Sequence, residues 1–313
     1  MSKEMMYQRD VYGKTLVELG KEDKSIVVLD ADLSGSTRTS FFKQEFPDRF
    51  FNFGVAEQNM ISTAAGLASC GKTVFASTFA MFAAGRAWDQ LRNSVCYSNM
   101  NVKLVATHAG VTVGPDGATH QALEDIALMR VIPNMTVIVP CDGPQTKDAI
   151  KAAAKMKGPV YVRLGRAKVP TIEGLGNFEL GKANVLKNGK DIAIFSCGIM
   201  TEQAIIASEE LLKFAIECSV INIHTIKPID VDTINNITKQ VDSIIICEEH
   251  SVIGGLGCAI EEVIAGAGRS VRVARIGVNN RFGQSGSSKD LLREYKLRAE
   301  DIIEIAKKLH SKS

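Results

Sequence analysis

Polar residues that can do chemistry are concentrated in one Gly-rich stretch, Thr107 to Gln121. It holds His108, Asp116 and His120 among three glycines and a proline, which predicts a folded loop and not a helix or strand. Two imidazoles and a carboxylate after a buried strand suit general acid–base work or recognition of substrate hydroxyls. A metal site is less well supported, because no cysteine or glutamate joins them at ligand spacing.

A second candidate is Glu57, which lies between an aromatic run that ends at Gly54 and an Ala- and Gly-rich helix predicted over 56–69. The unpaired N–H groups and the dipole of a helix start favour an ionised acid there. Apolar surroundings favour the protonated form instead. A glutamate between these two effects can share a proton with a bound ligand, although acids in the first turn of helices are also common without such a role.

Two aromatic residues, Phe79 and Phe82, follow the strand predicted over 72–76. They are three residues apart, so on a helix or tight turn their rings face the same way. Such a pair either packs into the core or, beside a strand end, holds an aromatic ring of a cofactor.

Two arginines are placed where an anion could be bound. Arg38 ends a Gly/Ser/Thr loop after the buried strand 25–29, and Arg166 follows the strand 159–164. Open α/β sheets bind ligands beyond the carboxyl ends of their strands, and guanidinium groups suit phosphate. The loop before Arg38 is equally consistent with a plain connection.

Alternating strands and helices must position these residues. Apolar runs predict strands at 25–29, 72–76, 102–106, 135–139, 159–164, 191–196, 219–223, 243–247 and 271–276, with intervening helices that include 86–95 and 121–130. The predicted fold class is therefore α/β, with two domains that each hold a mostly parallel sheet flanked by helices. We expect a first domain over 1–175, a linker over 176–190, where Gly and Asn are frequent, and a second domain over 191–313.

Composition limits the class of protein. Of the 313 residues, 45% are hydrophobic and 23% charged, and the net charge of +2 gives no reason to expect nucleic acid as a partner. No apolar run is long enough to span a bilayer, and the first residues lack an apolar signal core. The seven cysteines are scattered and form no C-x-x-C pair, which is typical of buried thiols in a reducing compartment. We expect a cytoplasmic protein with no membrane partner.

These segments together resemble the carboxyl-terminal two-thirds of transketolase. The similarity runs through VVLDADL, GVAEQNM, STFAMF, THAGVTVGPDGATHQ, VIVPCDG and RLGR, and it continues more weakly into the last domain. The GVAEQ string is shared by several thiamine-diphosphate enzyme families, whereas the His108 to Gln121 loop is the specific part. The resemblance implies a pyrimidine-binding domain followed by a transketolase C-terminal domain.

The resemblance also implies roles for single residues in ketol transfer through thiamine diphosphate. Glu57 matches the carboxylate that bonds the N1′ atom of the aminopyrimidine ring, and Phe79 and Phe82 match the aromatic pocket around that ring. The substrate-binding positions are His108 and His120 for hydroxyls and the reacting carbonyl, Asp116 for the donor's C2 hydroxyl, and Arg38 and Arg166 for the sugar phosphate. A third aromatic residue of the family is missing, because Gly85 stands in its place.

One motif of the family is absent from the sequence. Transketolases anchor the cofactor diphosphate through Mg²⁺ with a Gly-Asp-Gly motif, and this chain has none. The resemblance thus implies a split enzyme, in which a separate N-terminal subunit brings the metal–diphosphate half. Because the family's active site lies between two subunits, we expect an α2β2 heterotetramer that acts on sugar phosphates. This chain itself is expected to supply no metal ligand.

Three alternatives share part of the pattern. One is 1-deoxyxylulose-5-phosphate synthase, which shares the Glu motif and Asp-Gly-x-Thr-His but is normally one chain and lacks a His at the position of His108. Another is the β subunit of a 2-oxo acid dehydrogenase, which lacks the signature from Asp116 to Gln121. A non-catalytic regulatory subunit with a degenerate site is the third, and the intact Glu57, His108, Asp116 and His120 argue against it.

Overall fold

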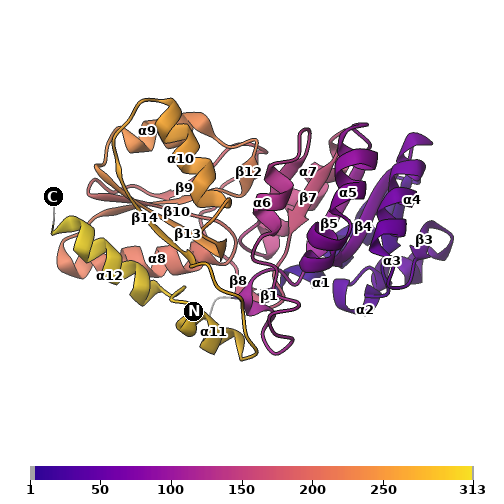
Figure 1. Ribbon diagram of the computed structural model, residues 1–313, viewed down its shortest axis with the longest axis horizontal. Helices are drawn as coiled ribbons and strands as arrows, with labels where there is room; N and C mark the ends of the chain where they lie inside the picture. The colour runs from indigo at the N-terminus through magenta and orange to yellow at the C-terminus, as the bar shows by residue number, and fades with distance from the viewer. Residues whose placement is uncertain (1–3, 312–313) are drawn as a thin grey trace.

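The computed structural model describes residues 4–311. Its first sheet has seven strands in the order β12-β6-β7-β5-β4-β2-β3, and neighbours are parallel except β12 and β6 (Figure 1). The strands are β2 (Ile26–Asp30), β3 (Phe50–Asn52), β4 (Thr73–Phe79), β5 (Val102–Thr107), β6 (Thr136–Ile138), β7 (Val160–Arg163) and β12 (Thr225–Lys227). This confirms the α/β fold class.

Side-chain alternation along β2 shows why its first four residues are all apolar. Ile26 and Val28 belong to one core cluster, with α1 (Gln8–Glu22) and α7 (Gly143–Lys155) over that face. Val27 and Leu29 belong to a second cluster, on the face covered by α4 (Glu57–Ser69). When both faces of a strand are buried, successive side chains all enter the core, so the strand sequence is a near-continuous apolar run.

The second sheet has five strands in the order β14-β13-β10-β11-β9 and lies at the other end of the molecule in Figure 1. They are β9 (Asn184–Lys187), β10 (Ile192–Ser196), β11 (Cys218–Asn222), β13 (Ser243–Ser251) and β14 (Arg272–Val278), and β9 alone is antiparallel to its neighbour. The helices are α8 (Met200–Leu211), α9 (Val231–Thr238), α10 (Leu256–Gly266), α11 (Ser288–Glu294) and α12 (Ala299–His310).

The two halves of the chain are interleaved. Strand β12 lies between β11 and β13 in sequence but pairs with β6 of the first sheet. One core cluster also runs across both halves and includes Ile126 from the first and Leu256 from the second. The short strands β1 (Met5–Tyr7) and β8 (Lys168–Pro170) form a separate antiparallel pair.

Short elements complete the chain. They are α2 (Ser34–Thr37), α3 (Ser40–Glu45), α5 (Trp88–Gln90) and α6 (Asp125–Arg130), the 3-10 turns η1 (Pro47–Arg49), η4 (Val111–Val113) and η5 (Leu212–Phe214), and the π-helical segments η2 (Phe82–Arg86) and η3 (Leu91–Cys96). The range 176–190, expected as a linker, includes β9, which leaves 176–183 without a strand or helix. Within residues 4–311 no helix is long and apolar enough to cross a membrane.

Two predicted helices differ from the structure, one in helix type and the other in its starting residue. The helix expected over 86–95 is instead η2, α5 and η3, and π-type turns of this kind are frequent at functional sites. The helix expected over 121–130 begins only at Asp125. The Gln121 side-chain amide donates to the carbonyl oxygens of Val111 (3.1 Å) and Gly114 (3.2 Å), which ties the preceding residues to the loop.

Candidate functional site

Parallel strands of the first sheet carry the candidate residues to one edge. Phe79 ends β4, His108 follows β5, and Arg166 lies three residues beyond β7. These three strands are neighbours in parallel pairing, so their carboxyl ends meet at the same edge. The sheet therefore brings together residues that are far apart in sequence.

Glu57 is the first residue of α4 and its side chain is 1% exposed. Its carboxylate accepts from Arg86, whose Nη1 lies 2.8 Å from each oxygen. The Gln58 side chain donates to the Arg86 carbonyl at 3.1 Å, which fixes the end of η2 against the start of α4. The Arg86 guanidinium also lies over the Phe82 ring, 4.4 Å from its centre. Glu57 is thus a buried acid whose cationic partner is itself half exposed.

Four rings form one aromatic cluster, which is connected to Glu57 through Arg86. Phe79 stacks on His108 at 3.8 Å between ring centres, and Phe79 and Phe82 stack at 6.0 Å. His120 approaches the Phe82 ring edge-on at 5.3 Å. The structure thus brings together the two phenylalanines and two histidines that the sequence singled out, and an aromatic ligand can stack there.

His108 is held as a neutral imidazole. It is 2% exposed, and burial, with Arg9, Arg166 and His120 nearby, lowers its pKa to about 3. Its Nε2 faces Arg9 Nη1 at 3.5 Å, and because arginine only donates, Nε2 accepts. The proton is then on Nδ1, which donates to the Thr107 hydroxyl at 2.9 Å. His108 also has φ of 59°, a left-handed conformation that side chains seldom adopt outside special sites.

Arg9 is a site residue that the sequence prediction missed. Besides His108, its Nη1 donates to the Ser36 carbonyl at 3.3 Å, while its buried Nε has no partner in the described structure. Burial and the nearby cations Arg38 and Arg166 lower the pKa of Arg9. A signal existed in the sequence: a cation in the first turn of a helix opposes the helix dipole, so another interaction must hold it there.

The other two arginines surround Arg9 but already have partners. Arg38 forms an ion pair with Asp10 at 2.6 Å and has φ of 70°. Asp30 shapes the turn before it by accepting from the Thr37 hydroxyl at 2.7 Å. Arg166 donates to the Val113 carbonyl at 2.8 Å. Three guanidinium groups near the edge of the sheet where these strands end produce a positive electrostatic potential that favours binding of an anion.

Asp116 and His120 lie on the outer part of the loop. Asp116 is exposed between Gly114 and Gly117, whose φ values of 86° and 77° give the loop its turn. The His120 Nδ1 is 2.9 Å from the Thr119 hydroxyl. Among residues 4–311 no group of three or more His, Cys, Asp or Glu side chains is arranged to hold a metal ion.

Known protein domains match nearly the whole chain. Residues 4–171 match the transketolase pyrimidine-binding domain, and residues 181–302 match the transketolase C-terminal domain.

Several similar proteins have about the same length as this chain. A Methanocaldococcus jannaschii protein, provisionally named a transketolase C-terminal section, is 52% identical over 94% of this chain and 93% of its own. The 6-deoxy-6-sulfo-D-fructose transketolase subunit SqwH of Clostridium sp. is 40% identical over 95% and 92%. A solved structure of a split-gene transketolase, described as an inactive β4 tetramer, superimposes with a TM-score of 0.89 at 47% identity and covers 98% of this chain and 99% of its own.

Proposed function

Because this chain belongs to the transketolase family, we propose that it is the C-terminal subunit of a two-chain transketolase. It would transfer a two-carbon ketol unit from a ketose phosphate to an aldose phosphate, and only with a separate N-terminal subunit. The observation that carries this proposal is the buried Glu57 carboxylate connected through Arg86 to the Phe79–Phe82–His108–His120 ring cluster, with three other arginines at the same sheet edge.

The residues present fit the aminopyrimidine half of thiamine diphosphate. The pocket offers a carboxylate at the start of a helix and two stacked phenyl rings, which suit a flat heteroaromatic ring with a basic nitrogen. When bound, the cofactor supplies a nucleophilic carbon and an electron sink. Glu57 would hold the proton at the ring's N1′ atom. Because Arg86 Nη1 lies 2.8 Å from both Glu57 oxygens, this role requires Arg86 to turn away from the carboxylate.

Substrate would lie between the loop and the arginines. Neutral His108, with its proton on Nδ1, has only the Nε2 lone pair to offer, so it would accept a hydrogen bond from a substrate hydroxyl in place of Arg9. Arg9, Arg38 and Arg166 would face the anionic end of the sugar. The Clostridium relative is named for a sulfonated sugar. A sulfonate is also a tetrahedral oxyanion, so these arginines suit either anion.

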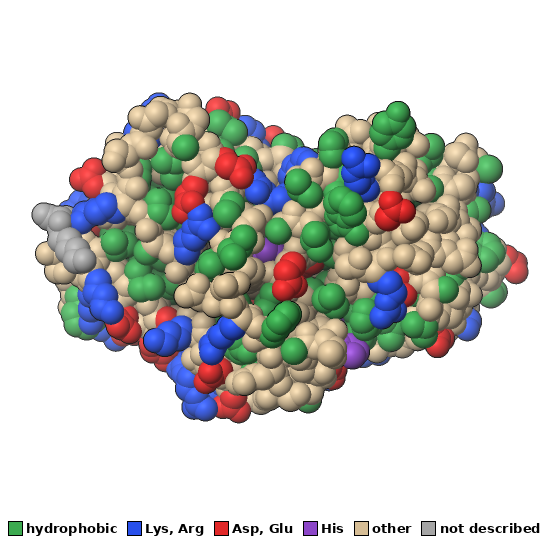
Figure 2. All heavy atoms as spheres, in the orientation of Figure 1, with side chains coloured by type: hydrophobic (Ala, Val, Ile, Leu, Met, Phe, Trp, Pro, Cys, Tyr) green, Lys and Arg blue, Asp and Glu red, His purple; other side chains and the backbone are tan. Residues whose placement is uncertain are grey.

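The partner subunit would supply the Mg²⁺ ligands and the diphosphate site, a role supported by the lack of the family's Gly-Asp-Gly motif in this sequence. An apolar groove of about 540 Å³ supports a further chain near the site. It lies between α6 and the second domain, and its lining includes Val131, Ile253 and Phe282, which are 67%, 62% and 83% exposed. On the face drawn in Figure 2, hydrophobic side chains are visible near the junction of the two domains.

We propose an α2β2 assembly. We also propose a reducing, cytoplasmic compartment, and the seven free cysteines support this location.

A ketol-transfer assay tests the proposal. This chain is assayed alone and with its N-terminal partner, in thiamine diphosphate and Mg²⁺, with xylulose 5-phosphate as donor and ribose 5-phosphate as acceptor. A sulfonated ketose is tested as a second donor. We expect turnover only in the mixture. Turnover by this chain alone would contradict the split site, and no turnover with any donor would contradict transketolase chemistry.

Arg166→Ala is expected to raise KM for phosphorylated donors about 10- to 100-fold, because a charge-assisted hydrogen bond to the anion is lost. Arg9→Ala should act similarly. A smaller effect is expected for Arg38→Ala, whose charge is already paired with Asp10. Steady-state kinetics with the matching unphosphorylated ketose is the control. An equal loss with both sugars would assign Arg166 to holding Val113 in the loop.

Asp116→Ala is expected to raise KM for ketose donors about 5- to 10-fold and to change KM for aldose acceptors little, because the carboxylate is proposed to accept a hydrogen bond from a hydroxyl group of the donor. Since C2 of a ketose is the reacting carbonyl, that hydroxyl is on a carbon next to C2, and not at C2 as the resemblance implied. The measurement is KM for each substrate at saturation of the other. Equal increases would show that Asp116 does not read the donor.

A further inference from the structure

The backbone of Thr112 is held on both sides by the second half of the chain. Its N–H donates to Glu249 Oε1 at 2.6 Å, and its carbonyl accepts from the Ser288 hydroxyl at 2.8 Å. Glu249 comes from β13 and Ser288 begins α11, whereas Thr112 belongs to the loop after β5. Thr112 is 1% exposed, so water does not compete for these two bonds.

The fit between this loop and Glu249 leaves little room for another arrangement. Gly110 has φ of 80°, and a Cβ atom there would lie 2.2 Å from the Glu249 carboxyl carbon. A side chain at Gly110 is therefore excluded both by backbone conformation and by contact. The close approach allows the carboxylate to reach the Thr112 N–H.

Thr112 lies midway between two residues of the proposed substrate site, four residues after His108 and four before Asp116. Its neighbour Val113 accepts from Arg166, so the same peptide segment also fixes that guanidinium. Movement of Thr112 would displace several proposed substrate contacts at once.

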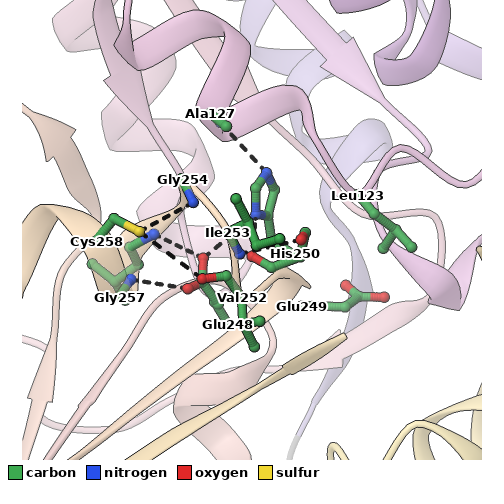
Figure 3. A network of polar contacts seen from close by, with 12 residues as sticks. Leu123, Ala127, Glu248, Glu249, His250, Val252, Ile253, Gly254, Gly257 and Cys258 are labelled. Carbon is green, nitrogen blue, oxygen red and sulfur yellow. Dashed lines mark hydrogen bonds and ion pairs between the residues drawn. The ribbon is translucent and has the colours of Figure 1, made fainter. Parts of the chain in front are cut away.

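Glu249 faces away from its sequence neighbours. Figure 3 shows Glu248 turned toward Gly257 and the start of α10, while Glu249 points the other way. Glu248 accepts from the N–H groups of Leu256 (2.7 Å) and Gly257 (2.9 Å), and thus caps α10 without touching the loop. Adjacent buried glutamates therefore hold two different elements.

The charged and titratable groups around Glu249 are Arg163 on β7, Asp125 on α6 and the Cys197 thiol after β10. Burial raises the pKa of Glu249 to about 7, while Arg163 and the hydrogen bond from Thr112 favour the ionised form. The carboxylate is thus ionised above about pH 7 and protonated below it. Ionisation strengthens the bond to Thr112, and protonation weakens it.

We propose that Glu249, with Ser288, is a positioning residue through which the C-terminal domain holds the substrate loop in its binding conformation. Its effect on substrate rests on the proposed transketolase function, whereas its effect on the loop does not. Because the ionised carboxylate holds the loop more firmly, KM for the ketose donor should rise as pH falls from about 8 to about 6.

Hydrogen exchange tests the loop contact in this chain alone, with no partner or substrate. In Glu249→Gln we expect the Thr112 amide to exchange about tenfold faster than in the parent chain. Glu248→Gln is the matched control, since it changes an equally buried neighbour that binds α10, and it should leave Thr112 exchange unchanged. Unchanged exchange in Glu249→Gln, or equal acceleration in both variants, would overturn the proposal. If Glu249→Gln does not fold, Ser288→Ala removes the other bond to Thr112 and should also speed exchange.

Kinetics of the two-chain complex tests the consequence for substrate. Glu249→Gln should raise donor KM about 5- to 10-fold, change kcat less than about twofold, and reduce the rise in KM between about pH 8 and about pH 6 relative to the parent. Faster exchange with unchanged donor KM would overturn the positioning role. If the parent complex shows no ketol transfer, the proposed function fails, and the exchange experiment alone decides whether Glu249 holds the loop.

Discussion

Glu57→Gln is expected to lower kcat of the two-chain enzyme about 10³-fold, the scale of a lost proton-transfer group. Glutamine preserves the shape of the side chain at the start of α4 but cannot hold or exchange a proton with a ring nitrogen. Losing the Arg86 ion pair should affect stability little, because the guanidinium is 45% exposed and can be hydrated. The measurement combines steady-state turnover with thermal unfolding.

Glu18→Gln is the control for this variant. Glu18 is a partly exposed acid on α1 that pairs with Lys147 and Lys151 at the surface, so turnover should be unaffected. Turnover of Glu57→Gln within about tenfold of the parent would remove Glu57 from the proposed proton-transfer role.

Asp125→Ala is expected to lower the free energy of unfolding by about 3–5 kcal/mol, the cost of leaving a buried charge without its partner. Asp125 accepts from Arg163 at 2.8 Å and from the Tyr161 hydroxyl at 2.7 Å, and both side chains of the ion pair are almost fully buried. Burial alone would lower the pKa of Arg163, but Asp125 and Glu249 raise it above its ordinary value. Without Asp125, the buried guanidinium of Arg163 keeps only Glu249 as a nearby carboxylate to offset its burial.

Urea unfolding measures this loss, with the m-value checked for two-state behaviour. The matched control is Glu294→Ala, which breaks the half-exposed pair with Arg281 and should cost about 0–1 kcal/mol. A loss below about 1.5 kcal/mol in Asp125→Ala would mean that water or other groups compensate Arg163.

The parts of the fold that could be predicted from sequence are those with local signals. The run from Ser25 to Leu29 predicted a strand, and the structure has β2 over Ile26–Asp30 because both faces of that strand are buried. Strands β1, β3, β8, β9 and β12 were not predicted. Each has only three or four residues, and their pairing is set by distant segments. Nothing in so short a run distinguishes a strand from a loop.

Some residues of the candidate site could likewise be predicted from the sequence, and others could not. Phe79, His108 and His120 were identified because their types and spacing are unusual along the chain, and the structure places their rings together. Arg9 was missed because its contact with His108 spans 99 residues. Arg86 was missed because the sequence around it predicted an ordinary helix, and the π-helical segment that carries it to Glu57 has no comparable local signal.

Strand β12 has a consequence for how this polypeptide could be divided. Although it follows the second domain's first strands in sequence, it covers the β6 edge of the first sheet, and Lys227 donates to the Arg130 and Ile132 carbonyl groups. A shortened chain that ended near residue 190 would leave β6 with unpaired N–H and C=O groups along an apolar strand. Such an edge is a template for association with other chains. The first domain is therefore expected to aggregate when produced without the second, although its own sheet is otherwise complete.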